Sequence, residues 1–261
     1  MIPNSTPNSV PNAVPNGREL TVVLDPAHGG PDAGSRGAAG VVESEIVLNF
    51  ARAIRQTLQG QGFRVLLTRE GNQDPSFDDR SSMINGLRNA VFVTLHVSST
   101  GPVGTVRTYS YGEIATPPVV SATGKPLPET RPGTTRSTAI SRTGLIPWDR
   151  AQEAYLNASE RLAQLTQIQL AQEFGGSPEL SLPAAVRQLR TIAAPAIAVE
   201  ISSVAVSAPA QLAQMTPRLA DAVTHAIVDF QVANGGALTT PAAGRGGGPG
   251  VGAGPPLGGA H

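Results

Sequence analysis

The 261-residue sequence contains no cysteine. This absence excludes disulfide bonds, thiolate metal ligands and a cysteine nucleophile. It does not identify the compartment, because an oxidising environment permits disulfides without requiring them. Any metal site in this chain would therefore use histidine nitrogen and oxygen ligands.

The sequence also lacks an excess of charge of one sign and lacks long apolar runs. It has 19 basic and 19 acidic side chains, so its formal net charge is zero. A nucleic-acid groove or an anionic membrane surface would favour a basic patch, which is missing. No stretch approaches the roughly 18 apolar residues of a membrane helix. We expect neither nucleic-acid binding nor membrane insertion of this chain.

The two ends of the chain differ in composition from the part between them. Residues 1–18 begin MIPNSTPNSVPNAVPNG, and the Pro-Asn repeats predict an extended, disordered tether. This stretch lacks the basic and apolar regions of a signal peptide, so either an export signal lies upstream or the protein is cytosolic. Residues 235–261 are rich in Gly and Pro and predict a disordered tail. The folded domain is therefore expected at residues 19–234.

Within that domain, short apolar segments alternate with amphipathic ones. Apolar, β-branched composition predicts strands, and apolar residues at helical spacing predict helices. The predicted strands are 19–25, 63–69, 91–96, 104–112 and 194–202, and the predicted helices are 43–62, 76–90, 148–174 and 209–232. This order indicates a single α/β domain with a mostly parallel twisted sheet flanked by helices on both faces. Residues 113–147 are rich in Pro and Thr and predict an insertion or flap.

Four polar residues fall where predicted strands end or where the first helix begins. His28 follows the first strand, His96 closes the third, Glu200 lies late in the last strand and Glu43 opens the first helix. In open α/β sheets, ligands bind at the carboxyl ends of the strands. Imidazole and carboxylate ligands suit zinc, and a carboxylate that does not bind the metal can act as a general base.

Taken singly, each of these residues also has a structural interpretation. His28 could cap a turn, and the glycines after it could contact a phosphate, although the spacing of a dinucleotide loop is absent. Glu43 suits the first turn of a helix because of the helix dipole. Glu200 is harder to explain structurally, because an ionisable group within a buried strand is costly unless it is paired or faces a site.

Several motifs together resemble a known family. The stretch LDPAHGGPDAGSRGAAGVVESEIVL is similar to the opening motif of the zinc-dependent N-acetylmuramoyl-L-alanine amidases. The similarity continues through VLLTRE, a helix with Arg80 and Asn85, FVTLH and PAIAVEIS, and covers about Leu20 to Phe230 in order.

The resemblance implies a function and a set of site residues. It implies a zinc ion held by His28, Glu43 and His96, with Glu200 as the general base and acid. Glu45 is the rival of Glu43, but two residues along a helix it would point about 200° away. The implied reaction is hydrolysis of the amide between N-acetylmuramic acid and the L-alanine of the stem peptide.

That reaction has consequences for substrate, partners and location. Peptidoglycan would be the substrate, which requires a periplasmic or cell-envelope location outside the cytoplasm. We expect a monomer, with an activator protein as a possible partner, and we expect residues 113–147 to act as a substrate-side flap or as an autoinhibitory segment.

The sequence departs from the family pattern at three places. Ala27 stands where the family has glycine, Val97-Ser98-Ser99 follows His96, and Ile201-Ser202-Ser203 follows Glu200. Ala27 matters only if that position needs a positive φ. These departures leave two alternatives open: a catalytically weak peptidoglycan-binding or regulatory domain of the same fold, and a zinc hydrolase of another amide.

Overall fold

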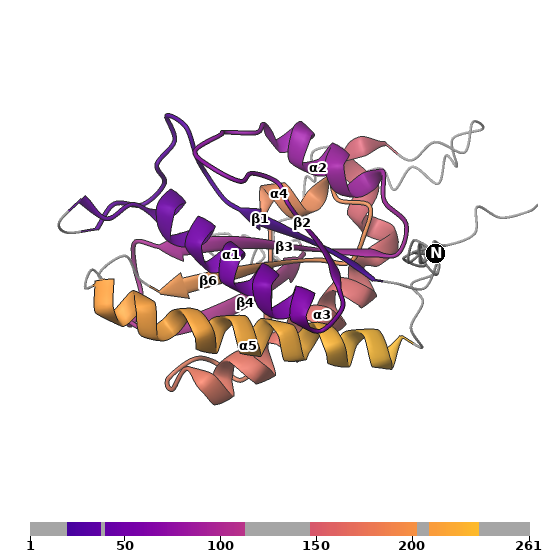
Figure 1. The fold of residues 1–261 in the computed structure, drawn as a ribbon. Coiled ribbons are helices and arrows are strands. Elements are labelled where there is room, and N and C mark those ends of the chain that lie inside the picture. The colour runs from indigo at the N-terminus through magenta and orange to yellow at the C-terminus, as the bar shows by residue number, and fades with distance from the viewer. Residues whose placement is uncertain (1–19, 38–39, 113–146, 203–208, 235–261) are drawn as a thin grey trace, which may run out of the picture.

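The computed structural model describes residues 20–37, 40–112, 147–202 and 209–234. Within these ranges one six-stranded sheet has the order β2-β1-β3-β6-β4-β5 (Figure 1). The strands are β1 (Thr21–Pro26), β2 (Arg64–Leu67), β3 (Ala90–Ser98), β4 (Thr105–Tyr111), β5 (Leu182–Ala184) and β6 (Ala196–Ser202). β2, β1, β3 and β6 are parallel, whereas β4 runs antiparallel to β6 and parallel to β5. The predicted α/β domain with a mostly parallel sheet is confirmed.

Helices cover both faces of the sheet. One face packs against the long helices α1 (Glu43–Gly60), α3 (Leu156–Glu173) and α5 (Pro209–Ala233), which share one apolar core with the strands. In Figure 1, α1 and α5 lie side by side in front of the sheet. The opposite face, which we call the site face, packs against the shorter helices α2 (Phe77–Asn85) and α4 (Arg187–Arg190). Its smaller apolar core includes Val23, Phe92 and Ala198.

Continuous apolar composition explains why the central strands form. Val22, Val23 and Leu24 of β1 are all fully buried, so neighbouring residues face opposite cores. A strand buried on both faces needs apolar residues at every position instead of alternate ones. This leaves few polar positions on β1, β3 and β6, and apart from Thr21 they lie in the carboxyl-terminal half of each strand or at its centre.

One predicted helix begins where it was expected, and another is divided in two. α2 begins at the predicted cap, because the Ser76 side chain accepts a hydrogen bond from the Asp79 amide and the Asp79 side chain accepts one from the Ser76 amide. The helix predicted at 148–174 is instead two elements, the 3-10 helix η2 (Trp148–Tyr155) followed by α3. Buried Gln152 of η2 donates hydrogen bonds to the carbonyls of Ile192 and Ala194, which ties η2 to the segment before β6.

Part of the predicted domain organisation lies outside the described residues. The tether at 1–18, the tail at 235–261 and nearly all of the insertion at 113–147 are among these parts, so those predictions stay untested.

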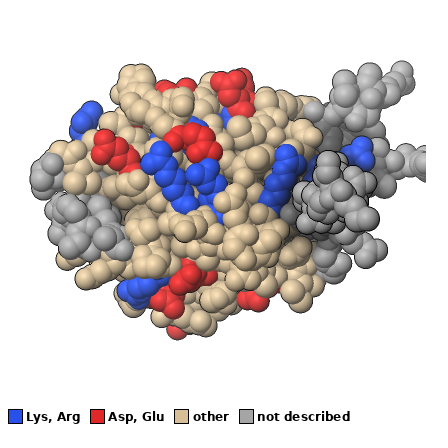
Figure 2. Space-filling view, in the orientation of Figure 1, with Lys and Arg blue, Asp and Glu red and all other residues tan. Residues whose placement is uncertain are grey.

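The surface of the described domain carries charges of both signs. In the face shown in Figure 2, the basic and acidic patches are small and lie next to one another. None of the helices among the described residues is long and apolar enough to cross a membrane.

Candidate metal centre

The four polar residues singled out from the sequence lie at one edge of the sheet. His28 follows the end of β1, His96 is near the end of β3, and Glu200 is near the end of β6. Because these strands are parallel, their carboxyl ends meet at the same edge. Glu43 reaches this edge as the first residue of α1.

His28, Glu43 and His96 form a group that could hold a metal ion. The Glu43 Oε1 atom lies 3.2 Å from His28 Nε2 and 3.3 Å from His96 Nδ1. One donor atom from each residue lies within 4.8 Å of the others. Two imidazoles and one carboxylate with room for a further ligand are the donor set of a catalytic zinc site. The residues present therefore fit zinc.

Glu43 is held in place by backbone amides. Its side chain is buried, Oε2 accepts a hydrogen bond from Ser35 N at 2.9 Å, and Oε1 accepts one from Val97 N at 2.9 Å. Burial alone would raise the pKa of Glu43, but hydrogen bonds with His28, His96 and these two amides lower its pKa well below the usual range. The carboxylate is therefore ionised and fixed in orientation, as a metal ligand must be.

His28 is oriented by Asp32, a carboxylate that was not predicted from the sequence. Asp32 Oδ2 lies 2.7 Å from His28 Nδ1, and Asp32 Oδ1 accepts a hydrogen bond from Gly34 N at 3.1 Å. With Nδ1 bonded to Asp32, the Nε2 atom points to Glu43. The hydrogen bond with Glu43 is the largest influence that raises the pKa of His28 to about 9, with burial opposing it and Asp32 adding to it.

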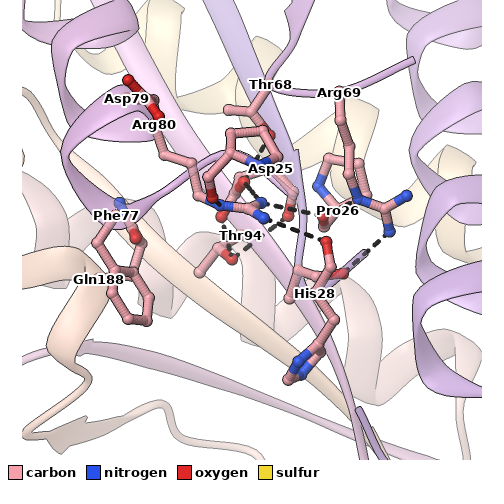
Figure 3. A network of polar contacts seen from close by, with 12 residues as sticks. Asp25, Pro26, His28, Thr68, Arg69, Phe77, Asp79, Arg80, Thr94 and Gln188 are labelled. Carbon is pink, nitrogen blue, oxygen red and sulfur yellow. Dashed lines mark hydrogen bonds and ion pairs between the residues drawn. The ribbon is translucent and has the colours of Figure 1, made fainter. Parts of the chain in front are cut away.

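The backbone of His28 is held by a buried polar network behind the site. Arg80 of α2 forms an ion pair with Asp25 of β1, at 2.6 Å, and donates to the His28 carbonyl at 3.1 Å. Thr94 and Thr68 donate hydrogen bonds to the same Asp25 carboxylate. Figure 3 shows this network around Asp25 and Arg80, with the His28 ring directed away from it.

This support explains an unusual backbone conformation. His28 has a φ of +62°, which is uncommon for a residue other than glycine. Arg69 adds to the support by donating to the carbonyls of Pro26 and Ala27. Ala27 itself is not among the described non-glycine residues with a positive φ, so alanine is compatible with that position.

Glu200 lies next to the candidate metal ligands on the adjacent strand. It is directly opposite His96 in the parallel β3–β6 pair, so both side chains emerge on the site face. Burial raises the pKa of Glu200, while the nearby charges of His96 and Arg107 oppose that shift. Glu45, the rival carboxylate for the metal, is exposed and is not part of the group.

A cavity of about 320 Å³ opens beside His28 and His96 on the β1 side. The exposed ring of Phe77 and the buried side chain of Gln188 line it, and the Gln188 Oε1 atom has no hydrogen-bond partner in the described part of the chain. The cavity could take an uncharged group that presents an N–H or O–H to Gln188.

Comparison with known proteins agrees with this geometry. A family model described as N-acetylmuramoyl-L-alanine amidase (Amidase_3) matches residues 22–229. The chain is 34% identical over 100 residues to the sporulation-specific N-acetylmuramoyl-L-alanine amidase of Bacillus subtilis (strain 168), a match that covers 38% of each chain. It is 35% identical over 80 residues to the amidase AmiA of Escherichia coli (strain K12), covering 31% of this chain and 28% of AmiA. These matches therefore span well under half of the curated relatives.

Solved structures share the fold over most of the described domain. The N-acetylmuramoyl-L-alanine amidase from Clostridium difficile 630 has a TM-score of 0.58 at 17% identity, covering 82% of this chain and 98% of that one. The amidase Ami1 from Mycobacterium smegmatis has a TM-score of 0.58 at 20% identity, covering 82% of this chain and 97% of Ami1.

Proposed function

Because the chain belongs to the N-acetylmuramoyl-L-alanine amidase family, we propose that it hydrolyses the amide between N-acetylmuramic acid and L-alanine in peptidoglycan. The observation that carries this proposal is the His28–Glu43–His96 group with Glu200 directly opposite His96. Catalytic zinc sites hold the metal with three protein ligands and keep a position for water, and a further carboxylate can act on that water as a base.

The metal in this proposal is zinc, held by His28 Nε2, a Glu43 oxygen and His96 Nδ1. When bound, zinc lowers the pKa of a coordinated water from about 15.7 to about 7 and polarises the carbonyl of the substrate. Asp32 holds the proton on His28 Nδ1, which keeps Nε2 available as a ligand. Glu43 supplies the negative charge of the ligand set from a fixed position.

Glu200 is the proposed general base and general acid. Its carboxylate accepts the proton of the attacking water and then delivers that proton to the departing L-alanine amine. The half-buried setting of Glu200 raises its pKa, which favours holding the proton between these two steps. The partial burial of Glu200, which is unusual for an ionisable residue in an apolar strand, thus serves its proposed role.

The substrate determines where the protein acts. Membership of a family of cell-wall amidases implies action outside the cytoplasm, and we assign the periplasm or cell envelope as the compartment. We also propose that the protein is a monomer and that a partner protein activates it.

The test is a digest of purified peptidoglycan analysed by mass spectrometry, with chelator and with zinc added back. We expect free stem peptides that begin at L-alanine, their loss with chelator and their return with zinc. Glu200→Gln keeps the size of the side chain but removes the base, so it should bind zinc normally and release at least 100-fold less peptide.

Glu45→Gln is the matched control, because Glu45 is an exposed carboxylate on the same first turn as Glu43. It should digest peptidoglycan as the unaltered protein does. Full activity of Glu200→Gln would contradict the assignment of the base. Zinc binding with intact peptidoglycan in every digest would favour a binding or regulatory domain instead.

A further inference from the structure

Arg107 occupies a position that the proposed reaction does not yet use. It lies on β4, directly opposite Glu200 of β6, and Glu200 is directly opposite His96 of β3. The three residues therefore form one row across neighbouring strands, in the order His96, Glu200, Arg107. Opposite residues on neighbouring strands project from the same face of a sheet.

The burial pattern of β4 supports this orientation. Val106 is fully buried in the core beneath α1, α3 and α5, and Tyr109 packs against the core of the site face. Since side chains alternate along a strand, Arg107 shares the face of Tyr109. Its charge is also close enough to Glu200 to influence that carboxylate.

The guanidinium of Arg107 is partly buried and has no partner in the described part of the chain. Among the described residues it makes no hydrogen bond and no ion pair within 4 Å, and its Nε atom is buried without a partner. Other buried arginines of this domain are saturated: Arg80 pairs with Asp25, and Arg69 donates to the carbonyls of Pro26, Ala27, Ser44 and Gly71. Leaving a partly buried cation without a partner is unfavourable, and a bound anion would remove that cost.

The chemistry of the proposed reaction indicates which part of the substrate reaches Arg107; this step rests on the proposed function. Glu200 must approach the departing L-alanine nitrogen to protonate it. Arg107 is the next residue in the row, about 5 Å farther from the metal ligands. The peptide that continues from L-alanine therefore extends over β4, whereas the residues that line the cavity beside Phe77 and Gln188 include members of β1 and β3 but none of β4.

The two halves of the substrate differ in charge. The carboxyl group of the muramic acid is consumed in the scissile amide, so the sugar half carries hydroxyl and acetamido groups only. The peptide half carries free carboxylates. A guanidinium presents a planar pair of N–H donors that matches a carboxylate.

We infer that Arg107 is a specificity residue that binds a free carboxylate on the peptide half of the substrate, just beyond L-alanine. The side chain thereby selects acidic stem peptides over amidated ones. Its partner is the substrate itself, which explains why the guanidinium has no partner among the residues that the structure describes.

Two synthetic N-acetylmuramoyl peptides test this assignment. They differ only in whether the residue after L-alanine carries a free carboxylate or a carboxamide. We expect the unaltered protein to cleave the acid with a kcat/KM about 10-fold or more above that of the amide. Arg107→Gln should lower the ratio of kcat/KM for the acid to kcat/KM for the amide to about 1; because the charge of Arg107 also acts on Glu200, the test is this ratio. Arg107→Lys should keep part of the preference, because it keeps the charge and loses the planar fork.

Arg64→Gln is the matched control, since Arg64 is exposed at the first residue of β2, at the far end of the strands. It should keep the full preference. Equal cleavage of both peptides by the unaltered protein would overturn the inference and leave the proposed function standing. An equal loss on both peptides in Arg107→Gln would overturn it as well.

Calorimetric binding of the same two peptides to Glu200→Gln measures the preference without turnover. Tighter binding of the acid, abolished when Arg107→Gln is added, would support the inference. If the unaltered protein cleaved neither peptide, that result would contradict only the proposed function. Equal binding of both peptides would overturn the assignment of Arg107.

Discussion

Asp32 is the residue on which the orientation of His28 depends. Its Oδ2 atom lies 2.7 Å from His28 Nδ1, and Asp32→Asn would replace this carboxylate with a neutral amide while keeping an oxygen for Gly34 N. Outer partners of metal-bound histidines contribute about 10- to 100-fold to metal affinity. We expect zinc affinity to fall by that amount in a competition titration.

Asp78→Asn is the control for this substitution, because Asp78 is an exposed aspartate in the first turn of α2, away from His28. Its zinc affinity should match that of the unaltered protein. Unchanged affinity in Asp32→Asn would mean that the contact with His28 does not support the ligand.

The same histidine gives metal binding a defined pH dependence. In the metal-free protein the pKa of His28 is raised to about 9, chiefly by its hydrogen bond with Glu43. Below that pH the ring is protonated, and a metal ion must displace the proton from Nε2. Zinc affinity should therefore rise with pH, by up to about tenfold per unit between pH 7 and 9, and then level off.

Competition titrations from pH 6.5 to 9.5, corrected for the chelator's own titration, measure this trend. Calorimetry in buffers of different ionisation enthalpy should show about one proton released per zinc near pH 7. An affinity that is constant between pH 7 and 9 would contradict a raised pKa for His28.

At the scale of elements, β4 depends on side chains to complete its outer edge. β5 pairs with β4 only from Tyr109 to Tyr111, so the earlier part of β4 has no strand beyond it among the described residues. The Gln167 side chain of α3 fills that place: it accepts a hydrogen bond from Thr108 N at 2.7 Å and donates one to the carbonyl of Pro178 at 2.6 Å. Gln167 is fully buried.

Replacing Gln167 by leucine should lower the stability of the protein, because it removes the contact with the edge of β4. The substitution leaves the buried amide of Thr108 without an acceptor, which costs about 1–3 kcal/mol of unfolding free energy. Denaturant titration measures the loss. Gln169→Leu, on the same helix but at an only partly buried position, should change stability by less than about 0.5 kcal/mol. Equal losses in the two variants would show that the contact to β4 contributes nothing specific.

The sequence predicts best those elements that are stabilised by their own apolar pattern. The central strands and long helices carry their own apolar patterns, so β1, β3, β6, α1 and α5 were predictable to within a few residues. β5 has three residues, includes Pro183 and is mostly exposed, so no pattern marks it. The 3-10 geometry of η2 depends on tertiary contacts of Gln152, which a local pattern does not contain.

At the scale of the whole molecule, site residues were predictable where the topology of the sheet places them and were not predictable where tertiary contacts place them. The proximity of His28, His96 and Glu200 could be predicted from the sequence, because the carboxyl ends of parallel strands share one edge of the sheet. Asp32 could not, because its contact with His28 depends on the path of a glycine-containing loop in which Gly34 has a φ of +66°. Arg107 could not either, since its place beside Glu200 depends on β4 running antiparallel to β6.

The three candidate metal ligands come from three separate segments of the chain: a loop after β1, the start of α1 and the end of β3. A metal ion bound there would act as a cross-link between these parts, and its binding free energy would add to the stability of the folded state. At a free zinc concentration 100 times the dissociation constant, the gain is about 2.7 kcal/mol. The amount of folded, protease-resistant protein would then follow the supply of metal in its surroundings, so that metal starvation would lower both the activity of the protein and its lifetime.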